Sequence, residues 1–232
     1  MIINLTMKSY RIPTISLLAV TLGLLAAPLQ AKEKKAPPAK SANQYAAFDT
    51  HPNEKLTIAA DPCTDPKDCD FFRLPYVQHA FIPIRVIFTN DGDTALSLDD
   101  VRIQFISADN EVLPAATEDE INRRLFTMKA ATGTRIPMPS PIPAITIHHP
   151  SVDKKITEDD DDFGFSGTVV NAHSTLAGYL FYDISTVDNP PLKNASLYIK
   201  DIHTLDDKKH FFSYTIPFNK WLAAQPTAKP DQ

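Results

Sequence analysis

The chain has 232 residues, enough for one sizeable hydrophobic core, and a formal net charge of −5 from 23 Lys and Arg against 28 Asp and Glu. This mildly acidic balance argues against nucleic acid as a partner, because binding to phosphates draws on a surplus of basic residues. Only 6 glycines accompany 20 prolines, a ratio that disfavours glycine-rich phosphate loops and favours long ordered loops.

Residues 1–31 have the order of segments that is typical of a secretory signal peptide. Lys8 and Arg11 precede an apolar run from Ile15 to Ala27, which is shorter than the roughly 20 residues of a spanning helix. We therefore expect export to the periplasm or secretion, with an uncleaved N-terminal anchor as the alternative and as the sole route to membrane contact. The Lys-, Ala- and Pro-rich residues 32–47 then predict a disordered linker.

Two cysteines, Cys63 and Cys69, flank the residues Thr-Asp-Pro-Lys-Asp. In an exported chain, an even number of closely spaced cysteines indicates a disulfide. The competing interpretation is a thiolate pair for metal or redox chemistry, but such pairs usually lie closer together in the sequence. We predict the disulfide Cys63–Cys69.

Period-two alternation predicts antiparallel strands through most of the remaining chain. It is clearest from Phe81 to Ile106, where it occurs on both sides of the turn residues Asn90–Asp93, and it predicts half-buried antiparallel strands joined by that turn. The full set of strand signals comprises Lys55–Ala59, Tyr76–Thr89, Leu96–Leu98, Val101–Ser107, Thr168–Val170, Leu176–Asp183, Ser196–Asp201 and His210–Pro217.

One helix interrupts the strand pattern. Thr117 and Glu120 have the spacing of a capping box, and an apolar stripe at helical spacing follows. The stripe consists of Ile121, Leu125 and Met128. We expect the helix to end near Ala131 and to lie across one end of the strands.

A proline-rich segment follows, from Ile136 to Pro143. Its alternating prolines enforce an extended path without ladder hydrogen bonds. It is either an ordered loop that covers the strands or a partner surface formed by Ile136, Met138 and Ile142.

The sequence offers no convincing catalytic or metal site. The acidic run Glu158–Asp162 lacks the residue order of a calcium loop, and we expect it to be a solvated surface. His148 and His149 are adjacent, so on an extended segment their side chains point to opposite faces. No Gly-x-Ser-x-Gly elbow is present. We therefore assign no catalytic residue, no metal ligand and no cofactor.

The order of these features resembles exported bacterial immunoglobulin-like proteins, including telomere-factor-like sandwich modules and domains of unknown function. Thr89–Asp93 matches their Thr-Asn-x-Gly-Asp turn, and Gly178–Phe181 matches their late Gly-x-Leu-Phe strand. The resemblance implies an all-β fold: an immunoglobulin-like antiparallel β-sandwich with one short inserted helix and a proline-rich loop. The sandwich would span residues 48–222, with the insertion at about 114–165 and a disordered tail over 223–232.

The same resemblance implies a non-catalytic binding or structural module of the cell envelope. Its partner would be an unknown protein or envelope component. Two other classes stay open: an enzyme that acts on envelope or extracellular polymers, for which the sequence leaves carboxylate pairs untested, and a calcium-stabilised adhesion module.

Overall fold

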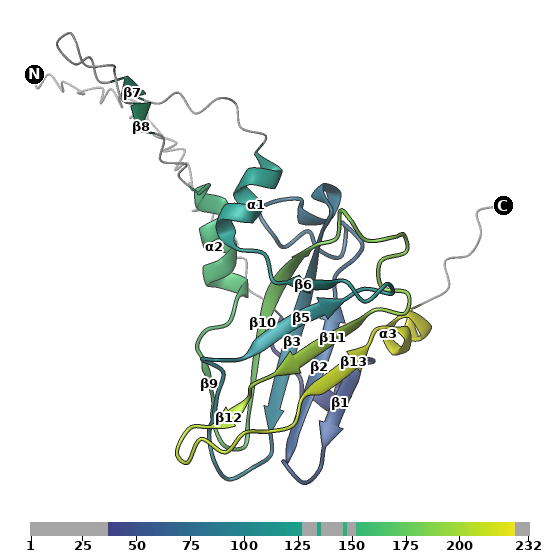
Figure 1. Cartoon of the computed structure of the whole chain (residues 1–232), viewed down its shortest axis with the longest axis vertical. Coiled ribbons are helices and arrows are strands. Elements are labelled where there is room, and N and C mark those ends of the chain that lie inside the picture. Colours follow the sequence, from purple (N-terminus) through teal and green to yellow (C-terminus); the bar gives the residue numbers. More distant parts are fainter. Residues whose placement is uncertain (1–36, 127–133, 136–145, 148–151, 226–232) are drawn as a thin grey trace, which may run out of the picture. The chain divides into compact units, whose positions relative to one another are not determined.

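A computed structural model describes residues 37–126, 134–135, 146–147 and 152–225. Within 37–126 and 152–225 the chain is mostly antiparallel sheet, as the sequence predicts (Figure 1). The first sheet has the order β1 (Phe48–His51), β2 (Leu56–Pro62), β3 (Phe81–Asn90) and β10 (Ser174–Asp183). The second has the order β13 (Tyr214–Pro217), β11 (Ser196–Lys200), β5 (Arg102–Ile106) and β6 (Val112–Pro114). A small third sheet has the order β12 (His203–Thr204), β4 (Leu96–Ser97) and β9 (Val169–Val170).

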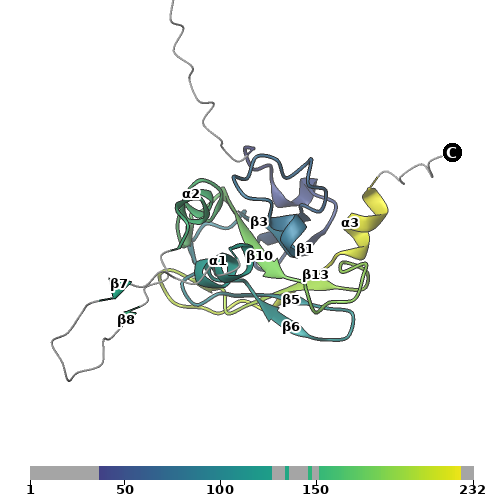
Figure 2. The same ribbon diagram turned by 90° about the horizontal axis from the view of Figure 1, so that it is seen from above.

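The main core lies between the two four-stranded sheets, which form separate layers in Figure 2. From β3, the side chains that enter this core are alternate ones: Ile82, Ile84, Val86 and Phe88. The second sheet contributes fully buried residues, namely Phe105, Leu197, Ile199, Tyr214 and Ile216. Burial of this many large apolar side chains, each worth roughly 1.5–3 kcal/mol, makes the sheet-to-sheet contact the main source of stability.

The expectation that β3 is half-buried is wrong, because all ten of its residues are buried. The outward-facing Ile87 packs with Ala42 and Ala59, and the outward-facing Phe81 packs in a second cluster with the segment between β2 and β3. A strand that is covered on both faces can be apolar throughout. Alternating apolar residues in such a strand therefore do not show that one of its faces is exposed to solvent.

The turn Asn90–Asp93 does not join paired strands. β3 pairs with β2 and β10, whereas β5 pairs with β11 and β6 in the opposite sheet. The Asn90 side chain donates to the Thr94 carbonyl (2.8 Å) and accepts from the Gly92 N–H (2.9 Å), which fixes the turn as the chain leaves the first sheet. The turn forms where the sequence predicts it, but the strand that follows it, β4, pairs with β12 and β9 and not with β3.

The predicted linker and tail are shorter than expected. The 3-10 helix η1 (Ala42–Gln44) packs on the first sheet, and the Ala42 N–H donates to Thr89 Oγ1 at 2.8 Å. Ala47 is fully buried in the main core. At the other end, helix α3 (Asn219–Ala224) continues past residue 222 and buries Trp221. Residues 42–47 and 223–224 therefore belong to the ordered fold.

The described residues between β6 and β9 include two helices, where the sequence predicts one. Helix α1 (Glu118–Leu125) has the predicted capping box, in which the Thr117 N–H donates to Glu120 at 2.8 Å, but the helix ends earlier than Ala131. The unpredicted helix α2 (Lys154–Phe163) is the second. Between them, the short strands β7 (Thr134–Arg135) and β8 (Thr146–Ile147) pair with each other. Among the described residues, none of the helices has both the length and the apolar character that crossing a membrane requires.

Candidate functional site

The segment from Cys63 to Ala80, between β2 and β3, covers one end of the first sheet. Cys63 and Cys69 lie at disulfide distance, as predicted, and the 3-10 helix η2 (Tyr76–His79) follows. The segment buries aromatic rings against α2 and β10, with the Phe72 ring centroid 5.1 Å from that of Phe163 and 5.2 Å from that of Tyr179. Such tilted and edge-on aromatic pairs stabilise the packing beyond the area that they bury.

A buried carboxylate anchors this segment to α2. Asp159 is fully buried, and it accepts hydrogen bonds from the Arg73 N–H (3.0 Å), the Arg73 guanidinium (2.9 Å) and the Tyr76 hydroxyl (2.9 Å). Hydrogen bonds to Asp159 and then Asp162 raise the pKa of Arg73, and burial together with the Asp159 charge raises the pKa of Tyr76. Asp159, Arg73 and Tyr76 therefore contribute to the stability of the fold through these hydrogen bonds.

This network corrects the expectation that Glu158–Asp162 is a solvated surface. The run lies on α2, whose buried residues Ile156, Asp159 and Phe163 follow helical spacing. Asp159 therefore points inward, while Glu158 and Asp162 reach Arg73 from the helix surface.

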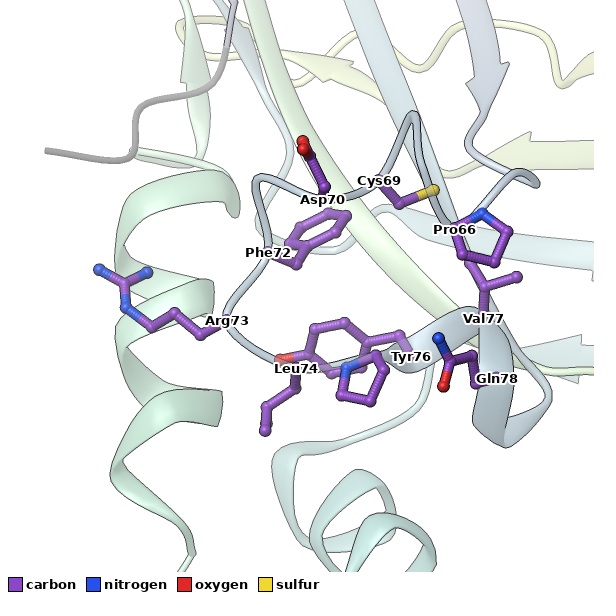
Figure 3. A pocket seen from close by; sticks show the side chains of 10 residues that line it. Pro66, Cys69, Asp70, Phe72, Arg73, Leu74, Tyr76, Val77 and Gln78 are labelled. Atoms are coloured by element: carbon purple, nitrogen blue, oxygen red, sulfur yellow. The ribbon is translucent and has the colours of Figure 1, made fainter. Parts of the chain in front are cut away.

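A first hollow of about 200 Å³ lies within the segment (Figure 3). We call it the loop hollow, and its lining includes Pro66, Asp70, Arg73, Tyr76, Val77 and Gln78. Figure 3 shows the Arg73 side chain directed at α2, away from the labelled residues of the hollow. The Arg73 guanidinium forms ion pairs with Glu158, Asp159 and Asp162 of α2, so it does not face the loop hollow as a charged group for acid–base chemistry.

A larger and more apolar cavity, of about 310 Å³, lies at the same end of the two sheets. We call it the end pocket, and its lining comes from the disulfide segment (Cys63, Thr64, Val77), the start of β3 (Phe81, Ile82), the β10–β11 connection (Ile184, Pro190, Pro191, Leu192) and α3 (Trp221, Leu222). None of these side chains titrates, since Cys63 is in the disulfide. Apolar walls with few polar groups are the usual character of a ligand cavity.

The indole of Trp221 is held in place from behind the end pocket. Its Nε1–H donates to Asp61 Oδ1 at 3.0 Å, and only 7% of the residue is exposed. Burial raises the pKa of Asp61, while the Trp221 hydrogen bond and the Arg85 charge oppose that shift. A fixed indole gives the pocket a preformed wall, so a ligand would not need to order it on binding.

The structure does not describe the remaining residues that the sequence singled out. Ile136, Met138 and Ile142, together with His148 and His149, lie outside the described residues. Within the described ranges, His, Cys, Asp and Glu side chains do not gather in groups of three or more that could hold a metal ion.

Comparisons of the chain with protein-family models, with curated proteins and with solved structures found no match. The site must therefore be interpreted from its own geometry. Sequence reasoning missed the end pocket and the Arg73–Asp159 pair, because each joins residues that are far apart in the chain. One signal was present: Trp221 is the single tryptophan, close to the C-terminus and next to an apolar Leu222.

Proposed function

We propose that the chain is an exported, immunoglobulin-like binding module without catalytic activity, and that its end pocket receives an apolar group of a partner protein or envelope component. The observation that carries the proposal is the end pocket itself. It is an apolar cavity with no titratable side chain in its lining, formed where the disulfide segment, the start of β3, the β10–β11 connection and α3 meet.

The strand order supports the immunoglobulin-like part of the proposal. In that fold, strands A, B and E share one sheet, and G, F and C share the other, with an added C′ beside C in variable-type domains. The series β2, β3, β10 and the series β13, β11, β5, β6 follow these two orders. The chain lacks the inter-sheet disulfide of antibody domains, since its cysteines lie within one connection.

The disulfide also supports export. Structural disulfides persist in oxidising compartments and are rare in the reducing cytosol. Together with the signal-peptide pattern of residues 1–31, Cys63–Cys69 favours a periplasmic or secreted location.

The volume of the end pocket limits the size of the apolar group that it could bind. A cavity of about 150 Å³ in a protein core is enough for one benzene. The end pocket has about twice that volume, which suits one or two apolar side chains or a small ring system. A lining without an acid or base favours binding over catalysis, because general acid–base chemistry needs a titratable group within hydrogen-bond reach of the substrate.

Trp221 provides a direct test, because it lines the pocket and no other tryptophan is present. We would titrate the mature protein with the neutral apolar dye 1-N-phenylnaphthylamine and measure energy transfer from the indole. The expected result is saturable transfer at one site. Val77→Phe, which fills the pocket, should abolish it, and Val112→Phe on the exposed edge strand β6 should leave it unchanged.

Each variant must first show a wild-type urea unfolding midpoint. Transfer that does not saturate, or that survives Val77→Phe in a folded protein, contradicts the proposed site. The surface of Ile136, Met138 and Ile142 stays a separate prediction, which the same titration does not address.

A further inference from the structure

Two smaller hollows share lining residues with the end pocket. The loop hollow shares Val77 with it. A third hollow, of about 210 Å³, shares Pro190 and Pro191 with it. We call this the proline hollow, and its lining also includes Ala108, Asp109, Val187, Asp188, Asn189, Lys193 and Asn194. An apolar pocket whose two neighbouring hollows each have charged side chains in their lining suits a ligand whose apolar centre carries polar groups toward both hollows.

Both sides are acidic. On the disulfide segment that forms the loop hollow, Asp65 and Asp68 are exposed, against Lys67. Arg73 does not offset them, since Glu158, Asp159 and Asp162 of α2 surround its guanidinium.

On the other side, the proline hollow is lined by Asp109 and Asp188 against Lys193. Glu111, which is exposed just beyond Asp109, adds a further negative charge and accepts from the Thr186 hydroxyl. Carboxylates thus outnumber cations on both sides of the end pocket, so complementary charge on a ligand would be positive on both sides.

We infer that the occupant of the end pocket is an extended polypeptide segment in which one apolar residue is flanked on both sides by Lys or Arg. This inference rests on the proposed function, because it names the ligand of that same pocket. An extended chain advances about 3.3 Å per residue, so residues a few positions apart reach from the apolar centre into both hollows. The charge of both hollows disfavours anionic lipid as the occupant.

The test uses the mature protein and three fluorescein-labelled peptides, measured by fluorescence anisotropy. The first is Lys-Lys-Ser-Leu-Ser-Lys-Lys. The second replaces each lysine with glutamate, and the third replaces the leucine with serine. We expect the first peptide to bind at least tenfold more tightly than either of the others, and its affinity to fall as salt is raised from low to physiological concentration.

Variants then locate the charges. Asp109→Asn with Asp188→Asn should weaken binding of the first peptide about fivefold, the combined effect of two exposed charges. The matched control is Asp91→Asn with Asp100→Asn, which neutralises two exposed carboxylates on the turn after β3 and near the start of β5, away from the lining of the hollows, and should change nothing. Neither pair should alter binding of the neutral dye.

The outcomes separate the two proposals. If the dye binds but the lysine and glutamate peptides bind equally, the inference is overturned and the apolar binding site stands. Equal binding of the leucine and serine peptides would overturn it too, because the attraction would then be charge alone. If the dye does not bind, the proposed function fails and the inference fails with it.

Discussion

Replacing Arg73 with Met should destabilise the protein far more than the loss of a surface ion pair. The substitution keeps an unbranched side chain that can still cover the neighbouring rings, and it removes the cation that faces Asp159. The carboxylate is 0% exposed, so water cannot replace the lost donor. Removing one partner of a buried ion pair costs about 3–5 kcal/mol, since an uncompensated charge is left in the interior.

The geometry puts this variant at the lower end of that range. Asp159 keeps two donors, the main-chain N–H of residue 73 at 3.0 Å and the Tyr76 hydroxyl at 2.9 Å. The contacts of Arg73 with Glu158 and Asp162 are partly exposed and add little. We therefore expect a loss of about 3 kcal/mol in the free energy of unfolding. For a domain of this size, that loss lowers Tm by roughly 6–12 °C.

Urea unfolding followed by circular dichroism would measure the loss. The matched control is Lys154→Met, which removes the 2.8 Å pair with Glu158 from a lysine that is 88% exposed, and should leave the urea unfolding midpoint almost unchanged. The double variant Arg73→Met/Asp159→Asn should be more stable than Arg73→Met alone, because it also removes the stranded charge. A loss below about 1 kcal/mol for Arg73→Met, or no recovery in the double variant, would refute the reasoning.

Three further predictions concern local packing, charge and capping. Gly178→Ala places its Cβ 2.5 Å from a backbone nitrogen of the loop after α2 and should cost about 1–3 kcal/mol, whereas Gly167→Ala, with nothing within 4 Å, should cost nothing in the same urea assay. Asp61→Asn keeps an oxygen for the Trp221 N–H and removes a buried charge. Because the pKa of Asp61 is raised in the folded state, stability is lost as the pH rises from the unfolded-state pKa of this carboxyl through the raised folded-state pKa. The variant should therefore gain stability relative to wild type at pH 7, and the gain should shrink toward pH 3; a gain that grows on acidification would contradict this. Thr117→Ala should cost about 1 kcal/mol by calorimetry, and an unchanged Tm would show that this cap contributes little.

Strands and one helix could be predicted from the sequence because their signals are local. The alternation in β10 and β11 and the capping box at Thr117 each need only neighbouring residues. Helix α2 was missed because its inward stripe carries Asp159 where an apolar residue would normally lie, and that carboxylate is tolerated through a partner 86 positions away. The strand partners of β3 could not be predicted either. A turn sequence does not determine whether the next strand pairs with the previous one as a hairpin or joins the other sheet.

The candidate site was beyond prediction for a related reason. The end pocket needs residues 63–64, 77–82, 184–192 and 221–222 to meet, and no local pattern encodes that meeting. The disulfide could be predicted because Cys63 and Cys69 are close in sequence as well as in space. The sequence favours Ile136, Met138 and Ile142 as a partner surface because apolar residues that alternate with prolines can be recognised in a sequence, whereas a cavity cannot.

The double cover over β3 has a consequence for the protein before it is fully folded. Phe81–Phe88 is a nearly unbroken apolar strand, and until the disulfide segment and η1 close over it, this strand is a template for pairing with other chains. Two residues interrupt it. Pro83 lacks an N–H, just beyond the last pair of the β2 ladder, and Arg85 places a charge at the middle of the run. A proline and a charge are the interruptions that limit aggregation of such strands, and in the folded chain Arg85 is buried and donates to the Pro37 carbonyl, so residues before β1 help to cover this part of β3.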